Sequence, residues 1–175
     1  MGERKTKSDV QQVRGYYQET FKDWGHSVDA LSWEDEQKQV LRFEILSSII
    51  PKSSGSVLDI GCGFGDLYQF LQTHGQGAVA YTGIDLMPQF TEIARSRFPH
   101  VTFIDGDFHQ LNQVYDFVLA SGPFSIKVAD NMQMIQGALK KMWAISSKGL
   151  AFNLLSNEVP LGERHGEYFV TIQLN

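Results

Sequence analysis

Short apolar runs alternate with stretches of helical periodicity over the carboxyl-terminal two thirds of the chain. The apolar runs have the length of buried strands, and they lie at 56–60, 79–84, 101–105, 115–120 and 149–155. Between them, apolar residues recur every three or four positions, which predicts helices at 65–73, 88–97 and 130–147. Strands that alternate with helices pair in parallel and are covered on both faces. The pattern therefore predicts an open, doubly wound α/β sheet.

The last of these helices carries clear boundary and packing signals. Asp130 is expected to be its N-cap, because a carboxylate can accept hydrogen bonds from the free backbone N–H groups of the first turn. Four residues at helical spacing are expected to form its buried stripe: Met132, Ile135, Leu139 and Met142.

Two helices are predicted before the sheet. The first covers 9–22, and one of its faces carries Val10, Val13, Tyr17 and Phe21. The second opens where Ser32 is followed three residues later by Asp35, a variant of the capping box, and Pro51 ends it. Its apolar residues are Val40, Leu41, Ile45, Leu46, Ile49 and Ile50. We therefore expect one domain, with an N-terminal helical cap at 1–55 and an α/β core at 56–175.

Composition narrows the class of protein. The chain has 175 residues and is 42% hydrophobic, which suits a single domain with a sizeable core. Its net charge is −5, and its basic cluster is limited to Arg4, Lys5 and Lys7, so nucleic acid is not an expected partner. Cys62 is the one cysteine and no apolar stretch could span a bilayer, so we expect a cytoplasmic protein without membrane contact. The five histidines lack metal-ligand spacing, and no metal site is predicted.

The strongest functional signal is residues 57–65, VLDIGCGFG, an apolar strand that ends in a glycine-rich turn and leads into a helix. In open α/β sheets ligands bind beyond the carboxyl ends of the strands, where this turn lies. Its glycines, at 61, 63 and 65, let the backbone approach a ligand closely. The dinucleotide fingerprint G-x-G-x-x-G needs a glycine where this chain has Asp66. A mononucleotide phosphate loop would need a Lys, and no residue of the turn is basic.

This segment resembles motif I of the class I methyltransferases that depend on S-adenosylmethionine (SAM), a Rossmann-like family. Two further segments match in the same order: residues 81–85, YTGID, and residues 104–108, IDGDF, each carry an acid at the end of a strand. Residues 115–121, YDFVLAS, resemble the family's fourth strand, and the resemblance covers about residues 56–155. It implies a SAM-dependent methyltransferase, EC 2.1.1.-, with S-adenosylhomocysteine (SAH) as product.

The resemblance also implies roles for residues at the strand ends. Asp85 would accept hydrogen bonds from the ribose hydroxyls, Asp107 would accept one from the adenine amino group, and Phe108 would pack on the adenine ring. The end of the fourth strand would lie beside the methionine portion. The implied cofactor-binding residues are Asp59, Gly61, Cys62, Gly63, Gly65, Asp85, Leu86, Asp107, Phe108, Ala120 and Ser121. Cys62 is expected to be a small packed residue rather than a nucleophile, Phe108 is either a core residue or an adenine contact, and Asp105 is expected to be a surface acid.

The residue types suit SAM chemically. The cofactor carries a sulfonium and an ammonium but no phosphate, so a turn without Lys or Arg and with Asp59 nearby fits a cation. A carboxylate such as Asp85 forms charge-assisted hydrogen bonds with a ribose diol. An NAD site would share that acid and would not need Asp107. Three functions stay open: methyl transfer to a small-molecule acceptor, SAM binding without catalysis, and NAD binding by a Rossmann protein.

The acceptor side is less informative. Methyl transfer from a sulfonium is an in-line displacement on an activated carbon, so alignment and the exclusion of water are the main requirements. Candidates for lining the acceptor site or for catalysis lie in the N-terminal helices: Tyr16, Tyr17, Trp24, His26 and Trp33. Of these, His26 is the hypothesis for a general base. Residues 121–125, SGPFS, lack the [DN]-P-P-[YF] tetrad of relatives that methylate exocyclic amines or glutamine amides, which favours a small-molecule acceptor.

The carboxyl-terminal segment departs from the family pattern, in which the sheet finishes with a helix, a sixth strand and an antiparallel seventh strand. Here about ten residues separate Leu155 from the alternating run Glu167–Leu174, so the usual sixth strand and its helix would be missing. The chain would either form a direct hairpin into an antiparallel last strand, or lack a segment near Asn157–Gly162. If a second copy covers the opened acceptor side, the protein would be a homodimer.

Overall fold

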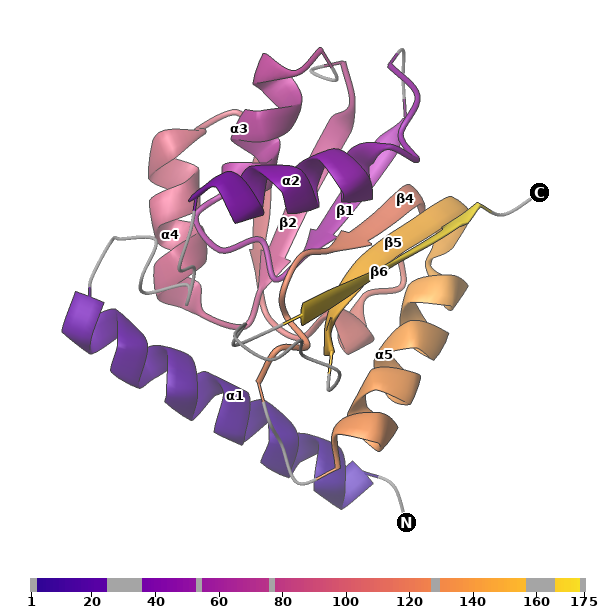
Figure 1. Cartoon of the computed structure of the whole chain (residues 1–175). Coiled ribbons are helices and arrows are strands. Elements are labelled where there is room, and N and C mark those ends of the chain that lie inside the picture. The colour runs from indigo at the N-terminus through magenta and orange to yellow at the C-terminus, as the bar shows by residue number, and fades with distance from the viewer. Residues whose placement is uncertain are drawn as a thin grey trace.

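The computed structural model describes residues 3–24, 36–52, 55–75, 78–126, 130–156 and 166–173. Within these ranges, one sheet has the strand order β3-β2-β1-β4-β5-β6. Its strands are β1 (Ser56–Ile60), β2 (Ala80–Asp85), β3 (Thr102–Asp105), β4 (Tyr115–Ala120), β5 (Ser146–Ser156) and β6 (Gly166–Gln173). The strands β1 to β5 pair in parallel, as the alternation of strands and helices predicts. The edge strand β6 runs antiparallel to β5, with Gly166 opposite Ser156 (Figure 1).

The helices lie close to their predicted positions. They are α1 (Glu3–Trp24), α2 (Glu36–Ser47), α3 (Asp66–Thr73), α4 (Pro88–Arg97) and α5 (Asn131–Ala144), with a 3-10 turn η2 (Phe108–Gln110) after β3. The first helix extends beyond the predicted 9–22 at both ends. The predicted opening of the second, at Ser32 and Asp35, lies outside the described residues. The last helix ends at Ala144 rather than at 147, because β5 already begins at Ser146.

The strand order creates the switch point at which open α/β sheets bind ligands. The chain moves from β1 outward to β2 and β3, then returns to the other side of β1 to add β4 and β5. Ile60, the last residue of β1, is level with Ile84 of β2 and with Ala120 of β4. Loops after β1 and β4 therefore leave the sheet side by side and in opposite directions, which opens a crevice at the carboxyl ends.

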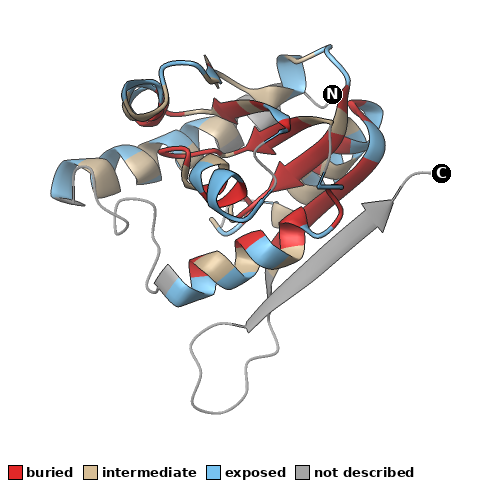
Figure 2. Ribbon diagram, turned by 90° about the horizontal axis from the view of Figure 1, so that it is seen from above, coloured by how far each residue is buried: buried red, intermediate tan, exposed pale blue. Residues whose placement is uncertain are grey.

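Apolar side chains fill the space on both faces of the sheet. One face carries Val57 and Leu119 and packs against α2 and α3, while the other carries Leu58 and Val118 and packs against α5. Figure 2 shows this layering, with buried positions along the strands and exposed positions on the outer sides of the helices.

The buried stripe of α5 differs from the prediction at one end. Met142 is fully buried and Ile135 and Leu139 pack partly against the core, but Met132 is 65% exposed. At 3.6 residues per turn, Met132 lies about 120° around the helix axis from the buried Ala138. The prediction for Met132 was therefore wrong, because the apolar spacing drifts off the face that meets the sheet. Asp130 is the N-cap as predicted, since its side chain accepts a hydrogen bond from the Gln133 N–H group at 3.0 Å.

The helix α1 lies across the carboxyl-terminal edge of the sheet and belongs to neither face (Figure 1). Tyr17 and Phe21 pack edge-on against the ring of Phe90, with ring centroids 5.8 and 5.6 Å apart. Phe64 of the glycine turn approaches the same ring to 5.1 Å. The apolar face predicted for the first helix thus attaches α1 to α4 and to the turn after β1.

Candidate functional site

The glycine turn after β1 needs glycine for its backbone conformation. Gly61, Gly63 and Gly65 have φ angles of +74°, +52° and +82°, in the region that side chains disfavour. A Cβ atom at Gly61 would lie 3.0 Å from Cβ of Pro123, and one at Gly65 would lie 3.1 Å from the rings of Phe98 and Phe103. The turn therefore runs close under its neighbours, and a side chain at Gly61 or Gly65 would collide with them.

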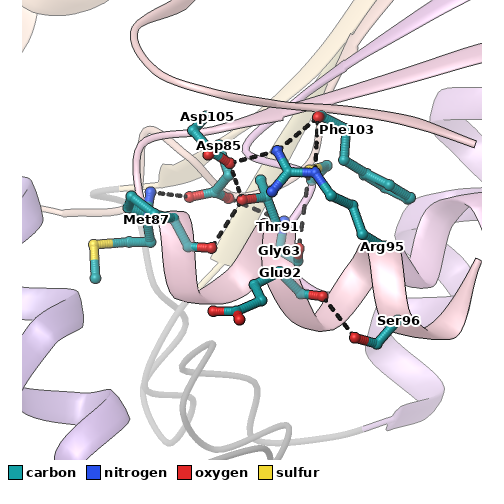
Figure 3. Close-up of polar contacts among 11 residues, drawn as sticks. Gly63, Asp85, Met87, Thr91, Glu92, Arg95, Ser96, Phe103 and Asp105 are labelled. Atoms are coloured by element: carbon teal, nitrogen blue, oxygen red, sulfur yellow. Dashed lines mark hydrogen bonds and ion pairs between the residues drawn. The ribbon is translucent and has the colours of Figure 1, made fainter. Parts of the chain in front are cut away.

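Asp85 ends β2 beside this turn. Its carboxylate accepts hydrogen bonds from the backbone N–H of Gly63 at 3.0 Å and of Met87 at 2.9 Å (Figure 3). Burial raises the pKa of Asp85 to about 6, although these backbone hydrogen bonds act in the opposite direction. The two carboxylate oxygens of Asp85 are thus fixed at the end of β2, beside the turn after β1.

Asp59 occupies a different environment, although it is only two residues before the turn. It is 2% exposed, and its carboxylate accepts a hydrogen bond from the Tyr81 hydroxyl at 2.5 Å. Burial raises the pKa of Asp59 to about 7, while the hydrogen bond from Tyr81 lowers it. The structure thus brings Asp59 beneath the turn and within the core.

Two acids follow β3, and both have partners. Asp105 accepts hydrogen bonds from Thr91 and from Arg95, whose guanidinium also binds the Phe103 carbonyl (Figure 3). This network joins α4 to the edge of the sheet, and Asp105 remains partly exposed, as expected of a surface acid. Asp107 caps η2 by accepting hydrogen bonds from the His109 backbone and from its ring Nδ1, at 2.9 and 2.8 Å.

The surroundings of Asp107 favour its charged form. The side-chain hydrogen bond from His109 lowers the pKa of Asp107 most, and the charge of Arg14 on α1 also lowers it. Phe108, the next residue, is half-buried and packs partly against the core on the α5 side, with its ring 4.2 Å from that of His109. Leu86, directly after β2, is likewise half-buried.

Two buried polar side chains lie near the carboxyl end of β4: Ser121 directly after this strand and Asn153 on the adjacent β5. Of these two, the sequence indicated only Ser121. Ala120 is fully buried and Ser121 is 8% exposed. Asn153 of β5 is 1% exposed, and its Oδ1 accepts a hydrogen bond from the Gly122 N–H at 2.7 Å. Within the described ranges, Ser121 Oγ and Asn153 Nδ2 have no hydrogen-bond partner. Asn153 lies inside an apolar strand, and an asparagine in such a run was the signal that could have identified it.

Of the acceptor-side candidates, Tyr17 is near the site. Burial raises its pKa above the usual range, and the charge of Asp85 is the next cause. Tyr16 is 42% exposed and contacts Tyr17 edge-on at 5.4 Å. His26, Trp33 and the side chain of Trp24 lie outside the described residues.

Cys62 fits its expected structural role. It is 6% exposed, and its backbone N–H donates to the Ile84 carbonyl at 3.1 Å. A Cβ atom at Gly83 would lie 2.8 Å from Cys62 Sγ, so the thiol packs directly on bare backbone of β2. Burial raises the pKa of this thiol well above its ordinary value, which disfavours the thiolate.

The described part of the chain carries neither a cluster of metal ligands nor a helix of membrane-spanning character. There, no three His, Cys, Asp or Glu side chains gather in a way that could hold a metal ion. None of the helices there combines the length and apolar character that crossing a membrane requires.

Comparison with known proteins decides the family. The family model described as a methyltransferase domain matches residues 57–147, which is just over half of the chain and includes every strand end discussed above except that of β5. The chain belongs to this methyltransferase family.

Among curated relatives, this methyltransferase domain is 30% identical over 109 residues to a protein of Mycobacterium tuberculosis that is named only as a methyltransferase. It is 29% identical over 118 residues to an uncharacterized methyltransferase of Alkaliphilus oremlandii. These matches cover 58% and 62% of the chain, and 64% and 53% of the two relatives. The chain therefore spans less than two thirds of the length of these relatives.

Solved structures share the fold at low sequence identity. The magnesium protoporphyrin IX methyltransferase of Synechocystis PCC 6803, solved with bound SAM, superimposes with a TM-score of 0.63 at 18% identity, over 85% of this chain and 77% of that one. The N-methyltransferase NodS from Bradyrhizobium japonicum WM9, in complex with SAH, superimposes with a TM-score of 0.57 at 17% identity, over 83% of this chain and 72% of that one. The Rossmann-like methyltransferase fold is thereby established for this chain.

Proposed function

We propose that this domain binds SAM at the carboxyl ends of β1, β2 and β3 and transfers its methyl group to a small-molecule acceptor. The observation that carries the proposal is the position of the Asp85 carboxylate, 3.0 Å from the Gly63 N–H at the switch point of the sheet. A nucleoside lying on the bare turn would meet this carboxylate with its ribose diol, and such hydrogen bonds to a charged acceptor are among the stronger ones.

The other strand ends supply the remaining contacts in this proposal. Asp107 would accept a hydrogen bond from the adenine amino group, while Leu86 and Phe108 would contact the adenine ring. Gly61 and Gly63 would allow the close approach of the sulfur, and Ala120 and the backbone of Ser121 would lie beside the methionine portion. Asp59, Cys62 and Gly65 would support the turn from beneath, since two of them are buried and Gly65 is packed under aromatic rings.

The cofactor would supply a methyl carbon already activated by the sulfonium. The chain therefore has to align the acceptor with the methyl carbon and the sulfur, and to exclude water. The helix α1 suits the exclusion of water, because it crosses the carboxyl-terminal edge of the sheet and packs there with Tyr17 and Phe21 against Phe90 of α4. Asp85 and the turn suit the alignment of the cofactor, because both are held in place by hydrogen bonds with backbone groups.

The charge distribution favours SAM over a dinucleotide. In NAD-binding sheets the pyrophosphate lies at the N-terminus of the first crossover helix. Here that helix begins with Asp66, whose carboxylate binds Arg97 at 2.6 Å. A pyrophosphate at this point would compete with the Asp66 carboxylate for the helix N-terminus, although Arg97 offsets the charge of that carboxylate. Acids near the turn suit a sulfonium cation.

Calorimetric titration with SAH tests the proposal. We expect Asp85→Ala to weaken SAH binding at least tenfold, because the ribose contacts are lost, and Asp107→Ala to weaken it less. Glu44→Ala, an exposed acid on α2, is the matched control and should bind as the unaltered protein does. Equal affinities in all four proteins would refute the cofactor site. Binding of SAH together with the absence of any methylated product from a metabolite extract would favour a non-catalytic module.

A further inference from the structure

The polar pair Ser121 and Asn153 is unexplained by the fold. Both side chains are more than nine-tenths buried, and within the described segments neither Ser121 Oγ nor Asn153 Nδ2 has a hydrogen-bond partner. Buried polar atoms in native proteins are nearly always paired, because an unpaired one loses its hydration without compensation. Two such atoms on adjacent strands therefore indicate a partner that the described residues do not supply.

The orientation of the Asn153 amide follows from its single contact. Its Oδ1 accepts from the Gly122 N–H at 2.7 Å, and the reversed amide would set two donors against each other. Nδ2 is therefore the end that has no partner among the described residues. The site offers one amide donor and one hydroxyl, both neutral.

The strand register places this pair relative to the cofactor site. Ile60 is level with Ile84 and Ala120, and Ala120 is level with Phe152. The next residue along each segment forms one row: Asp85, Gly61, Ser121 and Asn153. Gly61 and Ser121 begin the loops after β1 and β4, whereas β5 continues to Ser156.

Along this row, Asp85 and the pair lie on opposite sides of the glycine turn. Adjacent strands are about 4.8 Å apart, so roughly 14 Å separates the backbones at Asp85 and Asn153. If the adenosine lies over β2 and β3 and the sulfur over the turn, the pair lies beyond the methyl group, where the acceptor must approach. This placement rests on the proposed function.

We propose that Ser121 and Asn153 anchor the methyl acceptor by hydrogen bonding to a carbonyl or carboxylate oxygen. Amide and hydroxyl donors match such an oxygen, and a cationic amine would leave Asn153 Nδ2 unpaired. The anchor fixes the orientation of the acceptor, so its nucleophilic atom lies in line with the methyl carbon and the sulfur.

Asn153→Asp provides a sharp test. It keeps an oxygen for the Gly122 N–H and replaces the free donor with an acceptor. Ser121→Ala removes the hydroxyl, and Ser125→Ala, an exposed serine of the same loop, is the matched control. The protein is saturated with SAH and titrated with benzoate, benzamide and benzylamine, and with butyrate, butyramide and butylamine. The readout is the side-chain amide resonance of Asn153 in ¹H–¹⁵N spectra, assigned by its absence in Asn153→Asp.

We expect either the acids or the amides among the probes to shift this resonance. A shift with the acids but not with the amides would show that the pair binds a carboxylate. Affinity for that probe, followed by backbone shifts near Gly122, should fall at least tenfold in Asn153→Asp and Ser121→Ala and stay unchanged in Ser125→Ala. The amines should have no effect. Unchanged affinity in both variants, or no response to any acid or amide, would overturn the proposal.

A cofactor control separates this proposal from the proposed function. SAH and 5′-methylthioadenosine, which lacks the amino-acid tail, should both bind Asn153→Asp within twofold of the unaltered protein. Selective loss of SAH binding in the variant would assign the pair to the methionine tail and overturn the acceptor anchor. Failure of both compounds to bind the unaltered protein would overturn the cofactor site itself.

Discussion

At the scale of single residues, depth along a strand decides what an acid does. Asp59 and Asp85 project from the same face of neighbouring strands, since Asp59 is level with Gly83 and Asp85 lies two residues further on. Asp59 falls in the core beside Tyr81, whereas Asp85 reaches the edge of the sheet and accepts a hydrogen bond from the Gly63 N–H of the turn. Two positions of strand thus separate a buried acid from a binding candidate.

Asp59→Asn should change the pH dependence of stability. Burial raises the pKa of Asp59 from 3.8 to about 7, so between these values the folded protein holds the proton more tightly than the unfolded chain. The contribution of this group to stability is complete below about pH 4 and is lost as the pH rises through 7. Asparagine stays neutral and still accepts from Tyr81, so the variant should be more stable at pH 8 by on the order of 2 to 4 kcal/mol.

Urea unfolding at pH 5, 6.5 and 8 measures this difference. The two proteins should converge towards pH 4, and Asp85, present in both, cancels from the comparison. Parallel stability curves over the whole range would contradict a buried, uncharged Asp59.

Replacing glycine with alanine should lower the stability of the protein in the turn and raise it in a helix. Gly61→Ala should lose about 1–2 kcal/mol, because alanine is strained at a positive φ and its Cβ would press on Pro123. Gly15 lies within α1 with open space around it, so Gly15→Ala should gain about 0.5–1 kcal/mol. Thermal unfolding measures both, and equal changes in the two variants would show that the turn tolerates a side chain.

At the scale of elements, α1 connects the amino terminus to the crevice. Its aromatic residues meet the ring of Phe90, which Phe64 of the glycine turn also contacts. The position of α1 and that of the turn are therefore linked through one buried ring. The same helix brings Arg14 within electrostatic reach of Asp107 and Tyr17 within reach of Asp85.

Phe21→Ala should loosen α1 without unfolding the sheet. The variant loses an aromatic contact with Phe90 that holds one side of the helix, while the strands keep their hydrogen bonds. Amide hydrogen exchange should accelerate at least tenfold in residues 10–24 and stay unchanged in β1 and β4. Gln18→Ala, at an exposed position of the same helix, is the control. Uniform acceleration through the sheet would show instead that α1 and the core unfold as one unit.

At the scale of the whole molecule, ligand specificity should appear in the melting temperature. A ligand at 100 times its dissociation constant stabilises the native state by about 2.7 kcal/mol. For a chain of this size each kcal/mol raises the melting temperature by roughly 2–4 °C, so saturating SAH should raise it by several degrees. NAD at the same concentration should leave it unchanged, because Asp66 lies where a pyrophosphate would bind. A larger shift with NAD would reverse the assignment of the cofactor.

Much of the framework was predictable because local patterns specify it. The bounds of β1, β4 and α4 follow the apolar runs and Pro88 to the residue, since burial and helix initiation act over a few neighbouring positions. The errors lie where tertiary contacts override spacing. Met132 is exposed because the face of α5 is set by the sheet, and β5 begins early because its residues pair with β4.

The sequence by itself determined the succession of strands and helices, the glycine turn and the acids after β2 and β3, because these depend on residues close together in the chain. Only the tertiary structure decided that Asp59 is buried against Tyr81, that α1 crosses the strand ends, and that Asn153 binds the loop after Ser121. Asn153 lies 31 residues from Gly122 in the sequence, and α1 is farther still from the residues of α4 that it contacts. Hydrogen bonds between β4 and β5 bring Asn153 to its place. No local pattern encodes which distant strand becomes a neighbour, so packing of the whole sheet had to specify it.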